Sequence, residues 1–122
     1  MFTGLSTILS TADLPRLVAF YSEGLGGTEA YRFPEEGDPA YVVLTVAGAE
    51  LGIAVDPDAA DGATKQRFSL WVYTENCDQA AEQLVRFGAT VKNPPADQPW
   101  GERVADLYDP DGNWLHVAHR LS

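Results

Sequence analysis

The chain of 122 residues has little basic charge, a single cysteine and no long apolar run. Lysine and arginine number 8 against 18 aspartate and glutamate, which gives a net charge of −10 and a pI of about 4.3. Such a surface repels phosphate backbones and anionic lipids, so nucleic acid and membranes are not expected partners. A negative surface attracts cationic ligands, although it also serves solubility.

Other absences narrow the function further. The lone Cys77 excludes an internal disulfide and lies on an apolar helical stripe rather than in a reactive motif. The sequence has no phosphate-binding glycine loop, no Gly-x-Ser-x-Gly elbow and no Cys-x-x-Cys pair. The first residues lack the basic and apolar regions of a signal peptide, and no stretch is long enough to span a bilayer. We therefore expect a cytoplasmic protein.

The order of elements that the sequence predicts occurs twice. Each half has a strand-like run, at 5–10 and 68–73, then a helix-capping residue, apolar residues at helical spacing and a glycine stop. The apolar residues at helical spacing are Leu14, Leu17, Val18, Tyr21 and Leu25 in the first half and Cys77, Ala80, Ala81, Leu84 and Phe87 in the second. The spacing from Ser6 to the capping Asp13 equals that from Ser69 to the capping Asn76. Three strand-like runs follow each helix, at 29–33, 41–46 and 50–55 in the first half and at 89–92, 102–108 and 114–119 in the second.

Turn signals separate these runs, at 34–39, 47–48, 93–95 and 109–113. The pattern predicts one α+β domain over residues 1–122. Module one covers about 1–56, a linker about 57–65, and module two about 66–122, and each module has the order βαβββ. Half of this chain is too small to bury a core alone, so we expect the two modules to pack together.

Three stretches resemble the vicinal oxygen chelate superfamily, which includes glyoxalase I, extradiol dioxygenases and bleomycin-resistance proteins. They are the helix from Asp13 to Gly26, the Gln-Pro-Trp-Gly segment at 98–101 and the Asp-Pro-Asp-Gly-Asn turn at 109–113. Residues 97–119 are most similar to the bleomycin-resistance proteins. The resemblance implies a half-open barrel-like sheet with outer helices, and a homodimer. Thr7 stands where those proteins often carry a proline that helps exchange the first strand, so strand exchange stays open.

Superfamily enzymes hold a divalent metal that polarises two oxygens of the substrate. The resemblance places the four ligand positions at Ser6, Gly52, Ser69 and His116. Only the imidazole suits such a metal, because a serine hydroxyl is a weak ligand and glycine has no side chain. A two-residue shift at Gly52 brings in Glu50, which still leaves at most two ligands. We therefore predict no metal, no other cofactor and no catalytic residue.

The remaining polar residues near His116 are interpreted as structural. Glu102 and Asp106 lie on a neighbouring strand and are assigned to a solvated face. His116 is expected to lack an acidic partner that would make it a general base. His119 is an odd number of residues away and should face the opposite side of its strand.

Strand alternation predicts a cavity lined by aromatic rings, small residues and one histidine, which suits a flat conjugated ligand. Trp100 lies in a polar and proline-rich loop. It either packs against the core or against a dimer interface, or it forms an aromatic surface on which the ligand stacks. The same alternatives hold for the strand aromatics, and Phe33 with Tyr41 flanks a loop that could act as a lid. The predicted ligand-binding residues are Trp100, Trp71, Tyr73, His116, Ser69, Phe33 and Gly101.

The function that these features favour is metal-free binding of a small molecule. The protein would sequester an aromatic, cationic natural product, as in bleomycin-type antibiotic resistance. The alternative is a lyase, isomerase or dioxygenase of the same fold, with a metal held at other positions or with acid–base chemistry at His116. A third hypothesis is a subunit that serves assembly and whose cavity is vestigial.

Overall fold

The computed structural model describes residue 1, residues 6–59 and residues 68–122. The chain divides into two compact units, residues 1–61 and 62–122. Each unit has a four-stranded mixed sheet in the order βαβββ, which confirms the predicted α+β class. The described strands form two sheets and not one closed barrel. The single domain, its boundaries and the half-open arrangement of the two modules stay predictions.

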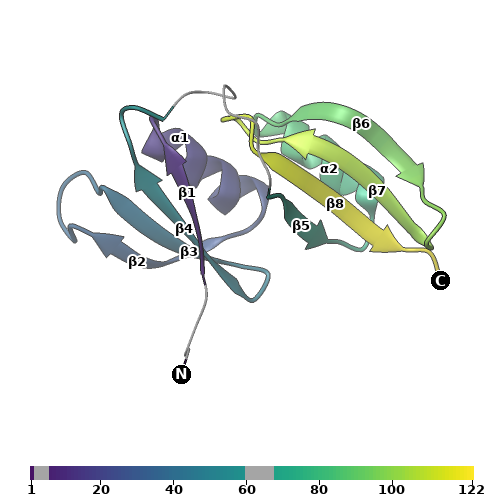
Figure 1. Ribbon diagram of the computed structural model, residues 1–122, viewed down its shortest axis with the longest axis horizontal. Coiled ribbons are helices and arrows are strands. Elements are labelled where there is room, and N and C mark those ends of the chain that lie inside the picture. The colour runs from purple at the N-terminus through teal and green to yellow at the C-terminus, as the bar shows by residue number, and fades with distance from the viewer. Residues whose placement is uncertain (2–5, 60–67) are drawn as a thin grey trace. The chain divides into compact units, whose positions relative to one another are not determined.

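The first sheet has the strand order β1-β4-β3-β2 (Figure 1). Strand β1 (Thr7–Thr11) runs parallel to β4 (Ala49–Val55), and β3 (Tyr41–Val46) is antiparallel to both β4 and β2 (Thr28–Phe33). The last three strands were predicted to within one residue. The first strand starts later than the predicted 5–10, and Leu5 lies outside the described residues.

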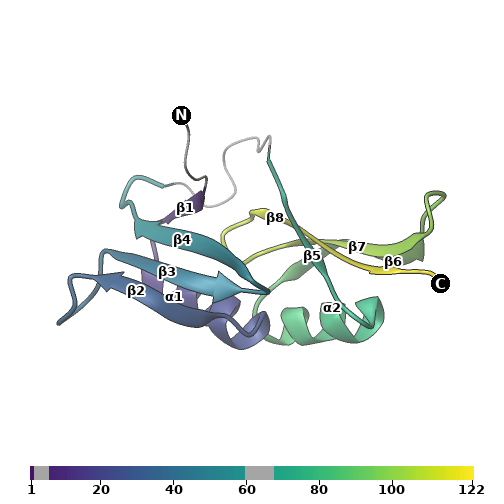
Figure 2. The same cartoon turned by 90° about the horizontal axis from the view of Figure 1, so that it is seen from below.

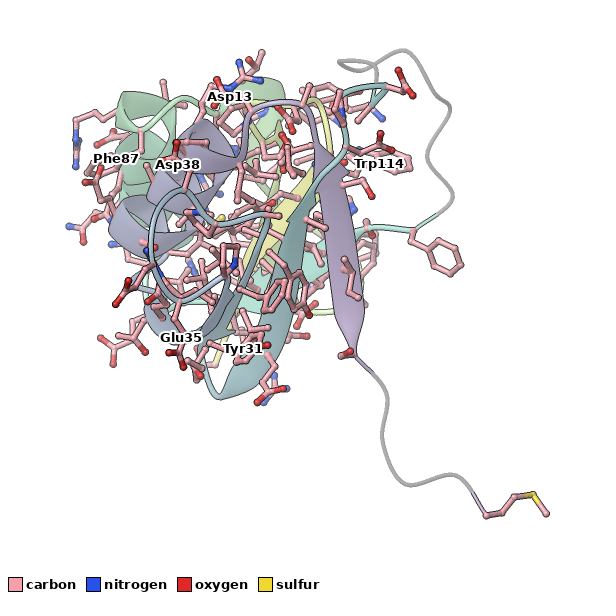
Figure 3. All side chains as sticks on the ribbon, turned by 90° about the vertical axis from the view of Figure 1, so that its left-hand side faces the viewer. Asp13, Tyr31, Glu35, Asp38, Phe87 and Trp114 are labelled. Atoms are coloured by element: carbon pink, nitrogen blue, oxygen red, sulfur yellow. The ribbon has the colours of Figure 1, made fainter. Side chains whose placement is uncertain are left out.

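Helix α1 (Leu14–Ala19) continues into the π-helical segment η1 (Phe20–Gly24) and covers one face of the first sheet. The Asp13 side chain, at the start of α1 in Figure 3, accepts a hydrogen bond from the Arg16 amide at 3.2 Å, which confirms the predicted cap. The wider π-helical turn brings Phe20 into the core beside the predicted Tyr21. The core side chains of this unit include Leu14, Leu17, Phe20, Tyr21, Val42, Leu44, Leu51 and Ile53.

The second sheet has the order β5-β8-β7-β6. Strand β5 (Leu70–Tyr73) runs parallel to β8 (Trp114–Arg120), and β7 (Glu102–Tyr108) is antiparallel to both β8 and β6 (Thr90–Asp97). Helix α2 (Cys77–Arg86) lies along one face of this sheet (Figure 2). Its core consists mainly of Cys77, Ala81, Leu84, Ala105, Leu107, Leu115 and Val117.

The ends of α2 agree with the sequence pattern, with one exception. The Asn76 side chain accepts a hydrogen bond from the Gln79 amide at 3.1 Å, and Gly88, with φ of +115°, follows the helix end. Phe87 was predicted to belong to the apolar stripe. It lies at the C-cap, where the chain leaves the helix (Figure 3). Its side chain is 40% exposed.

Strand β6 differs most from its prediction, which placed a strand at 89–92 and a turn at 93–95. The strand continues to Asp97, with one register shift between Val91 and Asn93 and a second, which spans the two prolines, between Asn93 and Ala96. Proline cannot donate to a sheet ladder, but β6 is an edge strand and tolerates this loss. Trp100 therefore lies in the short connection to β7 rather than in a long loop. None of the described helices is long and apolar enough to cross a membrane.

Candidate functional site

The polar groups of interest lie on the face of the second sheet opposite α2, which we call the distal face. His116 on β8 pairs with Trp71 on β5 and with Asp106 on β7, so the three residues share this face. Strand alternation assigns the same face to Tyr73, Glu102, Val104, Tyr108, Trp114, Ala118 and Arg120. His119 lies on the other face, where its Nδ1 accepts a hydrogen bond from the Cys77 amide at 2.8 Å. The predicted orientation of the two histidines is confirmed.

A hydrogen-bonded cluster occupies the middle of the distal face. His116 Nδ1 lies 2.6 Å from Asp106 Oδ1, and Asn93 Nδ2 donates to Asp106 Oδ2 at 2.8 Å. Both carboxylate oxygens therefore have a partner from a neighbouring strand. The prediction that His116 lacks an acidic partner is wrong, because the β7–β8 pairing places the two side chains opposite each other.

The cluster favours the ionised form of Asp106. Partial burial alone would raise the pKa of this carboxyl, but the hydrogen bonds from Asn93 and His116 and the nearby positive charge of Lys92 outweigh it, so the pKa is lowered. Glu102 is only 9% exposed and accepts a hydrogen bond from Trp100 Nε1 at 2.7 Å. Neither acidic residue belongs to a solvated face, so that interpretation is also wrong.

Aromatic rings surround the imidazole. The Trp71 ring centroid lies 4.9 Å from that of His116, and the Trp114 centroid lies 5.6 Å from it. Trp114 begins β8 (Figure 3), and the ammonium of Lys92 lies 4.1 Å from its ring centroid. The guanidinium of Arg120 is 5.1 Å from the Tyr73 ring. The distal face thus combines ring surface with one imidazole and charges of both signs.

Three of these rings keep much of their surface in water. The exposed fraction is 41% for Trp71, 53% for Tyr73 and 61% for Trp100. Trp100 is nevertheless held in place, because Glu102 on the distal face binds its indole N–H. Gly101, with φ of +93°, allows the tight connection into β7. Exposure of this extent shows that these rings are not core residues of the chain described here.

The other predicted site residues lie further from the cluster. Ser69 is exposed and directly precedes β5. Phe33 ends β2 in the first unit, opposite Tyr41, and is 60% exposed. The structure thus gathers Trp71, Tyr73, Trp100 and His116 on one face of the second unit, whereas Phe33 belongs to the other unit. Ligand binding by any of them stays a prediction.

The residues at the metal positions of the superfamily do not fit a metal. The Ser6 and Ser69 hydroxyls are weak ligands, and His116, whose Nε2 stays available, is the one suitable ligand among the four positions. A Cβ added at Gly52 would lie 2.7 Å from the Tyr41 hydroxyl, so a tyrosine fills the space that a ligand side chain would need. Among the residues that the structure describes, no three His, Cys, Asp or Glu side chains cluster as metal ligands would.

The sequence analysis missed Asp106 and Asn93, although a signal for Asp106 was present. The turn predicted at 109–113 is centred on Asp111, and residues five before and five after the centre of a hairpin face each other (111 − 5 = 106; 111 + 5 = 116), as the observed pairing shows. Asn93 gave no such signal, because it lies at a register shift in β6.

The second unit also has a hollow of about 520 Å³ between α2 and β6. Its apolar lining comes from Ala81, Val85, Val91, Pro94 and Pro95. Arg103 borders it and forms ion pairs with Asp78 and Asp97, each at 2.9 Å, which joins α2, β6 and β7. The hydrogen bond from Arg103 lowers the pKa of Asp78. This lining contains none of the His116 cluster.

The two βαβββ units, each with a four-stranded mixed sheet, define the fold class of this protein, and a match to a known family model agrees with that class. The chain belongs to the Glyoxalase/Bleomycin resistance protein/Dioxygenase superfamily, whose family model matches residues 5–117.

Individual relatives are more distant. The anthracycline biosynthesis protein DnrV from Streptomyces peucetius is 38% identical over 83 residues, which are 66% of this chain but only 27% of DnrV. The crystal structure of TioX from Micromonospora sp. ML1 matches with a TM-score of 0.74 and 21% identity, covering 97% of this chain and 100% of TioX. The fosfomycin resistance protein FosX from Listeria monocytogenes matches with a TM-score of 0.76 and 19% identity, covering 98% and 94%. The two structures show that the fold is shared.

Proposed function

We propose that this chain is a metal-free binding protein that sequesters an aromatic, cationic natural product on the distal face, in the manner of bleomycin-type resistance. One observation carries the proposal. Trp71, Tyr73 and Trp100 expose ring surface around a hydrogen-bonded imidazole. Exposed apolar surface of this kind, rimmed by polar groups, often marks a ligand-binding site.

The chemistry of the face suits a flat ligand more clearly than a charged one. Stacking of aromatic rings contributes roughly 0.5–1.5 kcal/mol per pair beyond the buried area. The charges of the face are balanced, since Glu102 and Asp106 are negative whereas Lys92 and Arg120 are positive. The expected preference for a cation therefore rests on the net charge of −10, which attracts cations over long distances.

The relatives support a role with small molecules. One is an anthracycline biosynthesis protein and another is a fosfomycin resistance protein. By analogy with the superfamily, we also propose that the protein acts as a homodimer. A native mass spectrum of the freshly purified protein tests the dimer and any co-purified ligand together. A purely monomeric spectrum would contradict the dimer.

The binding role is tested by titration calorimetry with metal-free bleomycin and other aromatic cations. Trp100→Ala should weaken binding at least about tenfold, or about 1.4 kcal/mol, while the circular dichroism spectrum stays unchanged. Phe87→Ala is the control, because this ring is also exposed but follows α2. Equal affinity of wild type and Trp100→Ala would show that Trp100 does not contribute to binding.

A second candidate, a lyase or isomerase, is favoured by the contact between His116 and Asp106. A carboxylate that orients an imidazole at Nδ1 leaves Nε2 able to take a proton from a substrate. Liquid chromatography with mass spectrometry of incubated ligands distinguishes the two functions, because chromatography also separates an isomer of unchanged mass. A new product that forms with wild type and not with His116→Gln would favour the enzyme. One equivalent of a transition metal per chain would contradict the metal-free part of the proposal.

A further inference from the structure

The protonation of the His116 ring follows from its partners. The two oxygens of the Asp106 carboxylate face Asn93 Nδ2 and His116 Nδ1, and a carboxylate accepts hydrogen bonds at both oxygens. Asn93 donates to one of its oxygens, so the 2.6 Å contact on the other requires a hydrogen on His116 Nδ1. In a neutral imidazole with a hydrogen on Nδ1, Nε2 carries a lone pair and accepts.

The second ring nitrogen has no partner within the protein as far as residues 6–59 and 68–122 show. No hydrogen bond joins Nε2 to any of these residues, whereas the His116 side chain is only 14% exposed. The rings of Trp71 and Trp114 lie within 6 Å of the imidazole, as centroid distances of 4.9 and 5.6 Å show. An acceptor is therefore held next to the surface on which a flat ligand would stack.

We infer that the distal face selects planar aromatic ligands that carry a hydrogen-bond donor, such as a phenolic hydroxyl, and that His116 Nε2 accepts from this donor. The inference rests on the proposed function, because it names the ligand chemistry of the same site. Asp106 and Asn93 act here as positioning residues, which fix the ring and its tautomer.

The expected selectivity is moderate. A ligand that leaves the hydrogen-bond acceptor of the site unpaired loses binding free energy, and this loss grows as water is excluded from the site. His116 keeps some access to water, so we expect a discrimination of about tenfold between a hydroxyl and its methyl ether rather than several orders of magnitude.

The tautomer can be tested without any ligand. In ¹⁵N-labelled wild type at pH 8, long-range proton–nitrogen correlations should show Nδ1 of His116 protonated and Nε2 unprotonated. The peaks are assigned with His116→Gln and His119→Gln. A hydrogen on Nε2, in either the other neutral tautomer or the doubly protonated ring, would overturn the inference.

A matched pair of probes tests the selectivity. The quenching of tryptophan fluorescence by 2-naphthol and by 2-methoxynaphthalene gives both affinities, and 2-naphthol should bind about tenfold more tightly. Equal binding of both would overturn the inference and leave the proposed function standing. Binding of neither compound up to millimolar concentration would overturn the inference, whereas the proposed function would fall only if metal-free bleomycin and the other aromatic cations also failed to bind.

Two variants separate hydrogen bonding from stacking. His116→Phe keeps a ring but removes the acceptor, so the preference for 2-naphthol should disappear while 2-methoxynaphthalene still binds. Asp106→Asn should reduce the preference to less than about threefold, because an amide can both donate and accept and no longer fixes one tautomer. A tenfold preference that survives in His116→Phe would assign the selectivity to another group and overturn the inference.

Discussion

The two sheets have the same topology but carry different chemistry at equivalent positions. In the first sheet, Gly52 pairs with Ile8 on one side and with Val43 on the other. Gly52 has no side chain, and the Tyr41 hydroxyl lies close to the point that a Cβ atom would occupy there. Among the described residues, aliphatic and phenolic groups therefore surround this position, and its two register neighbours carry neither an imidazole nor a carboxylate.

In the second sheet, the same three positions hold a stacking surface, an imidazole and a carboxylate. His116 takes the central place, with Trp71 and Asp106 as its neighbours. The backbone of one βαβββ unit thus supports either a filled apolar face or a polar site, and the side chains at three register positions decide between them. The difference locates the candidate site in the second unit.

The aromatic residues differ between the units in the same sense. Phe20 and Tyr21 of the first unit are buried under the sheet, with ring centroids 5.0 Å apart, whereas Trp71 and Trp100 of the second unit are exposed on the distal face. We infer that the first pair serves stability and the second pair serves binding. Each of the following predictions tests one part of this contrast.

The largest effect is expected for Phe20→Ala. Removal of a fully buried aromatic side chain leaves a cavity and should lower the free energy of unfolding by about 3–5 kcal/mol. Trp71→Ala should cost less than about 1 kcal/mol, since much of this ring is already in water. Urea unfolding followed by circular dichroism measures both. A similar loss in the two variants would make Trp71 a core residue and remove the contrast.

The second prediction concerns ligand affinity at equivalent positions. Trp71→Ala should weaken binding of an aromatic ligand about tenfold, or about 1.4 kcal/mol, because a stacking ring next to His116 is lost. Ile8→Ala changes the equivalent residue of the first unit, which is also exposed, and should leave affinity unchanged. Calorimetric titration of both variants decides this. A comparable loss in Ile8→Ala would show that the first unit also contributes to binding.

Much of this fold could be predicted because local signals and periodicity agreed. Asp13 and Asn76 cap their helices as expected, and β3 and β7 have the predicted bounds. Strand β6 was predicted too short, since two prolines resemble a turn in sequence but are compatible with an edge strand. The π-helical turn at Phe20 was missed because it breaks the ordinary helical period.

The candidate site was predicted only in part. Alternation correctly placed Trp71, Tyr73 and His116 on one face, because it depends on neighbours along a strand. Asp106 was wrongly predicted to lie on a solvated face. Its role depends on the residue of β8 that lies opposite it, which spacing along a single strand does not show. The contact between Asn93 and Asp106 depends on a register shift in β6, which no local sequence pattern predicts.

A third prediction uses pH to test the carboxylate that has no equivalent in the first sheet. The folded-state pKa of Asp106 is below its unfolded value, so its stabilisation is present above the unfolded pKa and is lost as pH falls through the folded pKa. Asp106→Asn should lower the free energy of unfolding by about 1 kcal/mol at pH 7. This difference should shrink below about pH 4, where the unfolded carboxyl takes up its proton.

Urea unfolding of wild type and Asp106→Asn at several pH values between 7 and 2 measures this effect. Asp106→Val, which carries the residue that the first sheet has at the equivalent position, tests whether the loss comes from the hydrogen bonds or from the side-chain volume. A difference that stays constant down to pH 2 would show that ionisation of Asp106 contributes nothing.

The smallest effect is expected at Gly52, where the comparison between the sheets began. An alanine there would place its Cβ 2.7 Å from the Tyr41 hydroxyl and 3.1 Å from Ile8 Cγ1. The tyrosine can move because its hydroxyl is at the end of the side chain, so Gly52→Ala should cost about 0.5–1 kcal/mol, below the usual range for added volume in a packed site. Tyr41→Phe removes the nearest atom, so the same substitution in that background should cost less. If Gly52→Ala were equally costly in both backgrounds, the hydroxyl would not be the group that fills the position, and the Tyr41 ring or Ile8, each with a carbon 3.1 Å away, would fill it instead.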